Sequence, residues 1–518
     1  MKYISTRGKL EECSFEDVVL AGLAPEGGLY IPTHIPSLPD DWKTAWENLS
    51  YQDLAVKIIS LFVSEDEVPH NELQALVEKT YAVNPLAFRK DSITPLIEMT
   101  PQKLYVLELF HGPTYAFKDL ALQLVGNLFE YFLTRRNKRK SPGEKPEKLT
   151  VVGATSGDTG SAAIYGLRKK DNISVFIMFP KGRVSQIQEA QMTTVLDPNV
   201  HNLSVSGTFD NCQDILKALL ADKEFNEKHS LGAVNSINWA RILCQIVYYF
   251  SAYFQLRKLP SFENGSEIQF VVPTGNFGDI LAGYYAKRLG LPMGKLGVAT
   301  NQNDILARFW KSGAYEKVDP KSPPVEGGVH ATTSPAMDIA VSSNFERLLW
   351  YLAYEKAQGT GDNEKRAAAC TQVDKWMKDV KKSGSVDLTD VLTAAQRDFV
   401  AHKVDDKETL KTIGEYYSGE KGGKSYLVDP HTAVGLSAAE LFASTSDSKS
   451  TVQIVLSTAH PAKFADAVEK ALGENSSFDP KTVFGNLLER ERRVEHIEGA
   501  EHELVGLVKN VIDKFASQ

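Results

Sequence analysis

The spacing of apolar residues divides the chain near residue 100. Before that point, apolar positions recur every three or four residues in 15–24, 51–63 and 71–82, which is typical of helices that bury one face. The stretch 25–39 is rich in proline and glycine, so we predict irregular structure there. The first ~95 residues are therefore expected to be mostly helical.

Beyond residue 100, short apolar runs end in glycine-rich or hydroxyl-rich turns and continue as helical patterns. We assign strand–loop–helix units, or their strands, to 149–167, 174–180, 268–290, 296–301, 426–442 and 452–472. Repeated units of this kind predict an α/β protein with a mainly parallel sheet and helices on its faces. Ligands bind at the carboxyl ends of such strands. Residues 356–387 are typical of an amphipathic helical insertion.

Composition indicates which broad classes of protein fit the chain. The chain has 518 residues, 42% of them hydrophobic, and a net charge of −8, which suits a soluble protein of several domains and disfavours binding to nucleic acid or to an anionic membrane. Its four cysteines are scattered and form no CxxC pair, so we expect no disulfide framework and no metal site. With no recognisable signal segment and no long apolar span, we expect a cytoplasmic protein.

The loop 273-PTGNFGD-279 has the features of a phosphate-binding turn. It follows an apolar strand and opens a helix, and Gly275 and Gly278 allow backbone amides to approach an anion. Asn276, Phe277 and Asp279 complete the loop. It lacks the GK[ST] ending of a nucleotide P-loop. The alternative is an ordinary turn in which Asp279 begins a helix.

A second loop, 153-GATSGDTGSAA-163, offers hydroxyl groups and a carboxylate after a strand. Thr155, Ser156, Asp158 and Thr159 lie at the start of the next predicted helix, where a substrate carboxylate could bind. The alternative is a capped helix start, because Ser, Thr and Asp are preferred at that position.

A third loop, 457-STAHPAKF-464, places the hydroxyls of Ser457 and Thr458 at the end of a strand, where one could donate to an unprotonated ring nitrogen. The alternative is a plain helix entry with Pro461 in its first turn.

Basic residues that could bind a further anion lie between the second loop and the phosphate-type loop. Arg241 follows Asn238 at the start of a long apolar helix, and Arg183 and Lys181 follow a strand. Guanidinium groups bind phosphate in a two-point fork. An interdomain salt bridge is the alternative for Arg241.

Lys118 lies in 107-LELFHGPTYAFKDLALQ-123, between an apolar strand and a helical pattern. It is either a solvated loop lysine or a nucleophilic amine. No HExxH, GxSxG or Cys/His cluster supports a hydrolase. A lysine, a phosphate-type loop and a hydroxyl at a strand end together suit an enzyme that uses pyridoxal 5'-phosphate.

Several segments carry a specific resemblance: HGPTYAFKD, GATSGDTGSAA, NSINWAR, PTGNFGDILAG, ATNQND and STAHPAKF, with STRG and FEDVVLAGLAPEGGLYIP near the start. They resemble the threonine synthase family, most closely its fungal branch, from about residue 4 to about 470. The resemblance implies a fold type II (tryptophan synthase β-like) pyridoxal phosphate enzyme. It implies that Lys118 forms the Schiff base and that the loop 275–279 binds the cofactor phosphate.

The same resemblance assigns Thr458 to the pyridine nitrogen, and Ser156, Asp158 and Thr159 to the substrate carboxylate and the cofactor hydroxyl. Many related enzymes have Asn where Asp158 stands, and a carboxylate cannot donate to a phenolate. Thr155, Asn238, Arg241 and Arg183 complete the expected substrate site.

The expected domains are 1–95, mostly helical; 96–135 plus 236–518, a large cofactor-binding α/β domain with a helical insertion at about 345–420; and 136–235, a smaller α/β domain. The implied reaction converts O-phospho-L-homoserine and water to L-threonine and phosphate by γ-elimination and β-addition of water, the last step of threonine biosynthesis. A threonine or serine dehydratase, or a silent binding protein with this fold, is the alternative. Monomer and homodimer both stay open.

Overall fold

The computed structural model describes residues 1–84, 87–101, 103–260, 262–263, 265–319, 328–445, 451–473 and 478–516. The three helices predicted near the N-terminus are confirmed as α1 (Phe15–Ala21), α3 (Tyr51–Ser60) and α4 (His70–Thr80). The side chains of Ser14 and Ser50 cap α1 and α3 by accepting a hydrogen bond from the amide three residues on. The stretch between α1 and α3 adds the short helix α2 (Trp42–Ala45) and the strand β2 (Tyr30–Pro32), which pairs antiparallel with β1 (Tyr3–Ser5) at the start of the chain.

A six-stranded sheet forms the larger half of the molecule, in the order β13-β10-β9-β14-β4-β3. Its strands are β3 (Leu96–Thr100), β4 (Leu104–Glu108), β9 (Glu267–Pro273), β10 (Leu296–Thr300), β13 (Phe399–Lys403) and β14 (Thr451–Ser457). All neighbours are parallel except β3, which runs antiparallel to β4. Alternate residues enter separate apolar clusters on the two faces, as the pleat requires: Val271 lies with Val455, and Phe270 with Ile454.

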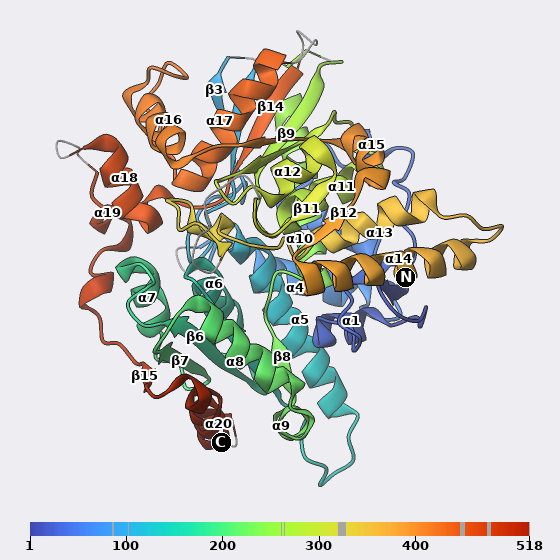
Figure 1. Cartoon of the computed structure of the whole chain (residues 1–518), viewed down its shortest axis with the longest axis vertical. Coiled ribbons are helices and arrows are strands. Elements are labelled where there is room, and N and C mark those ends of the chain that lie inside the picture. The colour runs from blue at the N-terminus through green and yellow to red at the C-terminus, as the bar shows by residue number, and fades with distance from the viewer. Residues whose placement is uncertain are drawn as a thin grey trace.

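A five-stranded, wholly parallel sheet forms the second half, in the order β15-β7-β6-β5-β8. Its strands are β5 (Leu149–Ala154), β6 (Ile173–Pro180), β7 (Val200–Val205), β8 (Leu231–Ala233) and β15 (Glu495–Ile497). Figure 1 shows β3, β9 and β14 in its upper half and β6, β7 and β8 in its lower half. The prediction of mainly parallel sheets flanked by helices is confirmed.

Helices α5 (Lys118–Lys138) and α10 (Trp239–Arg257) connect the two sheets. Helix α6 (Asp158–Leu167) lies between strands of the smaller sheet, and α11 (Gly278–Leu289) and α17 (Pro430–Thr445) lie between strands of the larger sheet. Helices α5 and α6 cross at Gly126 and Gly166, where a Cβ on Gly126 would overlap the Gly166 carbonyl. This close approach brings the first residues of both helices, Lys118 and Asp158, to within an ion-pair distance of each other.

The region expected as a helical insertion at 345–420 is mostly helical, with α13 (Phe345–Lys356), α14 (Asp362–Ser383), α15 (Thr389–Asp398) and α16 (Asp406–Ser418). It also supplies β12 (Ser385–Asp387), which pairs with β11 (Ala314–Glu316), and the edge strand β13. The strand expected within 426–442 was a wrong prediction: residues 425–429 form no strand, and α17 follows directly.

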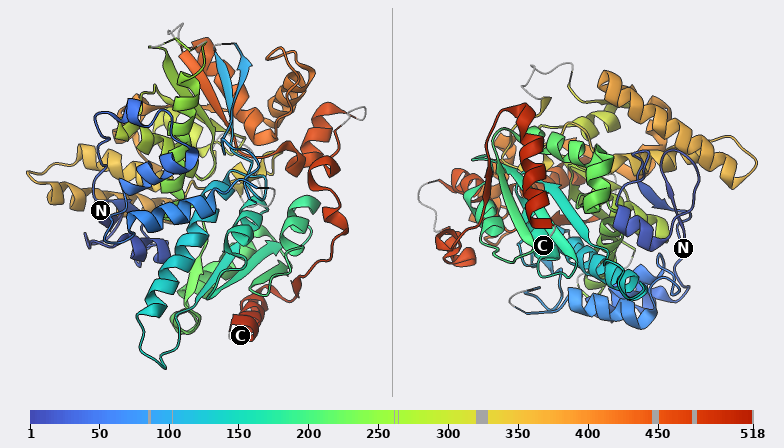
Figure 2. Two further views of the ribbon diagram at one scale, coloured as in Figure 1. Left: turned by 180° about the vertical axis from the view of Figure 1, so that it is seen from behind. Right: turned by 90° about the horizontal axis from the view of Figure 1, so that it is seen from below.

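The chain ends on the second sheet. After α18 (Ala465–Leu472) and α19 (Lys481–Phe484), the chain descends along the side of the molecule, and β15 adds to β7. Helix α20 (Leu504–Ala516) then covers the smaller sheet, as the view from below in Figure 2 shows. The expected large domain included these residues, and the pairing of β15 instead joins them to the smaller sheet. The other domain boundaries stay a prediction.

The remaining helices are α7 (Gln186–Thr193), α8 (Phe209–Ala221), α9 (Lys223–His229) and α12 (Ile305–Ser312), with short 3-10 turns at Pro335–Met337, Pro461–Phe464, Leu487–Glu489 and Glu501–Glu503. All four cysteines are free thiols. Within the described part of the chain, no helix combines the length and apolarity needed to cross a membrane.

Candidate active site

Lys118 is the first residue of α5, and its side chain is buried. The segment before it is held against the end of β14, because the Phe117 amide donates to the Thr458 carbonyl at 2.8 Å. The Lys118 amine lies 4.8 Å from the centre of the Phe117 ring. Burial lowers the pKa of Lys118, and the positive charges of Lys463 and Arg241 act in the same direction against the opposing Asp158. The structure therefore excludes a solvated loop lysine.

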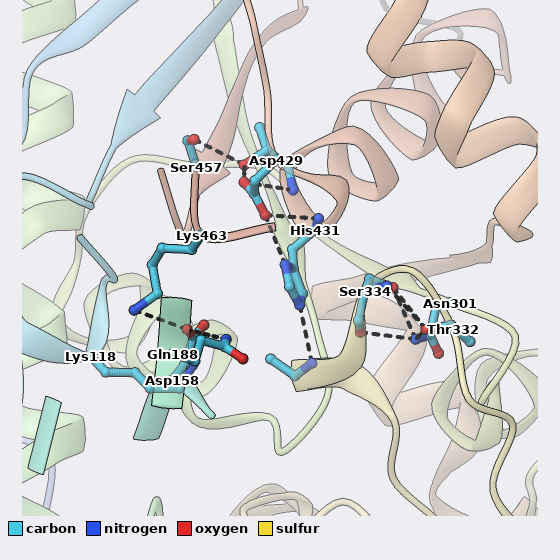
Figure 3. A network of polar contacts seen from close by, with 12 residues as sticks. Lys118, Asp158, Gln188, Asn301, Thr332, Ser334, Asp429, His431, Ser457 and Lys463 are labelled. Atoms are coloured by element: carbon cyan, nitrogen blue, oxygen red, sulfur yellow. Dashed lines mark hydrogen bonds and ion pairs between the residues drawn. The ribbon is translucent and has the colours of Figure 1, made fainter. Parts of the chain in front are cut away.

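Asp158, the first residue of α6, lies between two lysines (Figure 3). Its Oδ2 is 3.6 Å from the Lys118 Nζ, and its Oδ1 is 3.1 Å from the Lys463 Nζ. Gln188 donates to the same Oδ1 at 2.9 Å. Burial alone would raise the pKa of Asp158, but Lys463 and Lys118 outweigh it and hold that pKa well below its usual range. Asp158 is therefore a carboxylate.

The loop 275–279 has the open amides that a phosphate requires. The backbone amides from Gly275 to Asp279 donate to none of the described residues, and they lead into the N-terminus of α11. Their carbonyls are held from behind, since Ser342 Oγ donates to the Gly275 carbonyl at 2.7 Å and the Asn344 amide to that of Asn276 at 3.0 Å. Phe277 adopts a left-handed conformation, with φ 63°, and its ring is buried.

The loop packs closely from behind, because a Cβ on Gly275 would lie 3.0 Å from backbone atoms of Ala336 and Met337. That segment is positioned by His431, whose Nε2 accepts from the Ala336 amide at 3.1 Å. Asp429 orients the ring through His431 Nδ1 at 2.8 Å. Figure 3 shows this chain of contacts beside Lys463 and Asp158.

The side chain of Asp279 is engaged by two tyrosines of the protein. Its Oδ1 accepts hydrogen bonds from the hydroxyls of Tyr248 at 2.5 Å and Tyr249 at 3.0 Å. Burial raises its pKa to about 7. Only the amide of Asp279 is therefore available to a phosphate.

Arg241 lies on the first turn of α10 and is 3% exposed. Its Nε and Nη1 have no hydrogen-bond partner among the described residues. Burial lowers its pKa to about 10, and no carboxylate pairs with it there. The structure does not support the alternative of a salt bridge. A buried guanidinium with two free donors needs an anion.

The other predicted anion-binding residues either contact groups of the protein itself or are exposed. Asn238 caps α10, accepting from the Ala240 amide and donating to the Val19 carbonyl, so both ends of its side chain are taken. Arg183 is exposed on the turn after β6. Lys181 pairs with Glu498 at 2.6 Å. The part of these three residues in binding the substrate stays a prediction.

The polar residues of the loop 153–163 also have different roles. Thr155 is a capping residue, because its Oγ1 accepts from the amides of Gly157 and Gly160, each at 2.9 Å. Ser156 is exposed and Thr159 is half-buried beside Asp158, and neither hydroxyl has a hydrogen bond to another residue that the structure describes. The capped-helix alternative is thus correct for Thr155.

Thr458 is buried at the end of β14, and its hydroxyl donates to none of the described residues. The neighbouring Ser457 Oγ is instead engaged with Thr432 Oγ1 at 2.9 Å. A free hydroxyl at Thr458 therefore remains for a ring nitrogen.

These residues fit pyridoxal phosphate: a buried amine for its aldehyde, free loop amides for its phosphate and a free hydroxyl for its ring nitrogen. The sequence patterns missed three contributors, namely Lys463, Gln188 and His431. Lys463 alone gave a signal, as a lysine inside the apolar run PAKFADAV.

Family models match most of the chain. "Threonine synthase N terminus" covers residues 2–81, "Pyridoxal-phosphate dependent enzyme" covers 89–370, and "Threonine synthase, C-terminal" covers 432–512.

Individual relatives agree. The threonine synthase of Saccharomyces cerevisiae is 51% identical over 99% of this chain and 97% of its own length, and that of Schizosaccharomyces pombe is 51% identical over 95% and 94%. A crystal structure of threonine synthase from yeast covers 100% of this chain and 99% of its own, at 49% identity with a TM-score of 0.90. A crystal structure of threonine synthase from Brucella melitensis with bound PLP matches over 100% of both chains, at 40% identity and with a TM-score of 0.84. The chain belongs to the threonine synthase family.

Proposed function

We propose that this protein is a pyridoxal phosphate-dependent carbon–oxygen lyase, a threonine synthase, which converts O-phospho-L-homoserine and water to L-threonine and phosphate. The observation that carries this proposal is Arg241, whose two free donors lie in the same buried site as Lys118. A dehydratase of free threonine or serine needs no second phosphate site. A site for phosphohomoserine needs one for the cofactor phosphate and one for the substrate phosphate.

Bound at this site, the cofactor withdraws electrons from the carbons next to the substrate amine, so that protons leave them more readily. Lys118 holds the aldehyde end. The amides of 275–279 hold the phosphate with the help of the α11 dipole. The Thr458 hydroxyl would donate a hydrogen bond to the ring nitrogen, and a neutral donor there would leave that nitrogen unprotonated.

Lys118 is the residue that moves protons. Burial lowers its pKa, which favours a neutral amine able to accept a proton at Nζ from the α carbon and to return it to a neighbouring carbon. Asp158, 3.6 Å away, stabilises the ammonium that forms in between. Phe117 beside the amine helps to exclude water.

Arg241 binds the substrate phosphate in this proposal, with Ser156 and Thr159 on the carboxylate side. Arg241→Gln removes the charge, so we expect KM for phosphohomoserine to rise by roughly tenfold or more, since a charged hydrogen bond is worth about 1.5–3 kcal/mol. Cofactor affinity, measured by titration of the visible absorption, serves as the control. Reduced cofactor affinity with an unchanged KM would assign Arg241 to the cofactor phosphate instead.

Turnover tests the function itself. The purified, cofactor-loaded protein should release phosphate and threonine in equal amounts from phosphohomoserine, and no keto acid from threonine or serine. Keto acid formed from threonine, without phosphate release from phosphohomoserine, would identify a dehydratase. A colourless protein without either activity would identify a silent binding protein.

We place the reaction in the cytoplasm, because all four cysteines are free thiols, as a reducing compartment favours. The acidic balance of −8 supports a protein that works on small molecules without nucleic acid or a membrane.

A further inference from the structure

A second buried lysine lies in the active site. Lys463, in the turn after β14, has no exposed surface. An ammonium is rarely buried unless it is paired, because leaving water costs it several kcal/mol. Its polar contacts among the residues that the structure describes are Asp158 Oδ1 at 3.1 Å and the Thr114 carbonyl at 2.8 Å.

These two contacts connect three parts of the site. Lys463 follows a strand of the larger sheet, whereas Asp158 follows a strand of the smaller sheet. Thr114 lies in the segment that leads into Lys118, and its amide and hydroxyl are held in turn by Asp119, each at 2.7 Å. Lys463 thus links Asp158, a contact that Figure 3 shows, to the segment before Lys118, which it reaches through the Thr114 carbonyl.

The two lysines share one carboxylate unequally. Lys463 and Gln188 take Oδ1 at hydrogen-bond distance, whereas Lys118 is 3.6 Å from Oδ2, beyond such a bond. Two ammonium groups on one buried carboxylate repel each other, so a positive charge at Lys463 acts against a second one at Lys118.

We propose that Lys463 is a positioning residue for Lys118: it takes up the charge of Asp158, fixes the Lys118 segment through the Thr114 carbonyl, and disfavours a second positive charge on the Lys118 amine. The inference deepens the proposed function, in which Lys118 must be a neutral amine. It assigns Asp158 to this charge balance as the partner of both lysines.

The charged and titratable groups around the pair are few. Asp158, Lys463, Arg241 and Asp279 act on Lys118. His431 acts on Asp158, and Asp119 faces Lys463. Without Lys463, Lys118 is the cation nearest to Asp158. The carboxylate then stabilises a positive charge on the Lys118 amine more than it does in the wild type.

The test is the pH dependence of cofactor capture by the full-length, cofactor-free protein. The neutral Lys118 amine attacks the cofactor aldehyde, forms a carbon–nitrogen bond and releases water, so the rate of growth of the visible band follows the neutral fraction. In Lys463→Met we expect the half-maximal rate at a pH about one unit or more higher, and a rate near neutrality about tenfold lower. Lys463→Arg should keep the wild-type profile, because it keeps the charge.

Two further variants separate charge from packing. Asp158→Asn combined with Lys463→Met removes both ends of the pair, and its profile should return toward that of the wild type. Lys170→Met is the matched control, since Lys170 is also largely buried and pairs with Glu130 at 3.2 Å, away from the site; its profile should not move.

A Lys463→Met profile that superimposes on the wild-type profile would overturn the inference. If Lys463→Met does not fold, the double variant provides the test. A half-maximal rate of cofactor capture at a higher pH in the double variant than in the wild type would also overturn the inference. The readout needs no turnover. Wild-type protein that captures no cofactor would instead refute the proposed function.

Discussion

Asp279 shows how burial changes a single carboxyl group at this site. Its pKa rises from 3.8 to about 7 because burial disfavours the charged form, although two tyrosine hydroxyls oppose the rise. The folded protein therefore binds a proton at Asp279 between about pH 4 and pH 7, where the unfolded chain has lost it. The stability that this proton contributes is complete below pH 4 and is lost as the pH rises to about 7.

Asp279→Asn removes this pH dependence and keeps an oxygen for the two tyrosines. We expect the variant to gain stability relative to the wild type as the pH rises from 4 to 7, by a few kcal/mol at most, and the gain to level off above 7. Thermal or denaturant unfolding of the cofactor-free proteins across this range measures it. Parallel stability curves for the two proteins would contradict the raised pKa.

The predictable residues are those whose role is local. The loop 275–279 was recognisable because its glycines and its place before a helix already specify open amides. Asn238 and Thr155 were assigned to the substrate, although the same residue types cap helices, and the structure uses them as caps. Lys463 and His431 act through partners distant in sequence, which no local pattern contains.

At the scale of elements, the crossing of α5 and α6 sets the geometry of the site. Both helices begin at a residue of the site, Lys118 and Asp158, and their contact at Gly126 and Gly166 fixes the distance between those first residues. The packing is backbone to backbone, so it leaves no side chain that could give way.

Gly126→Ala places a methyl group against the Gly166 carbonyl, and the helices must move apart. We expect a loss of about 1–3 kcal/mol in unfolding free energy, together with weaker cofactor binding. Gly506→Ala is the matched control, since Gly506 lies inside α20 with open space around it and should gain up to about 1 kcal/mol. Equal stabilities of the two variants would show that the crossing is not tight.

Strand–loop–helix units were predictable as elements because the apolar run and the turn that ends it adjoin in sequence. The short strands were not, since β8, β12 and β15 have three residues each and no alternation to detect. The apolar run at 426–428 was misassigned as a strand, because periodicity cannot distinguish a short buried segment from a short strand.

At the scale of the molecule, the C-terminal segment completes the smaller sheet. Leu504, Val508 and Ile512 of α20 enter an apolar cluster with residues of β5, β6 and β7. This arrangement was not predictable, because β15 pairs with a strand almost 300 residues earlier in the chain.

Val508→Asp buries a charge in that cluster, and we expect a loss of about 3 kcal/mol or more in unfolding free energy. Asn510→Asp, on the exposed side of the same helix, should change it by less than about 0.5 kcal/mol. Denaturant unfolding measures both. A Val508→Asp variant as stable as Asn510→Asp would show that α20 does not cover the sheet.

The central claim, that Lys118 holds pyridoxal phosphate in a threonine synthase site, is tested most directly by locating the attached cofactor. Borohydride reduction fixes the cofactor to its lysine, and mass spectrometry of the digested protein identifies that residue. We predict a single reduced cofactor on the peptide that contains Lys118, and none on any lysine of the Lys118→Ala protein. A cofactor attached to Lys463 or to any other lysine of the wild-type protein would contradict the account.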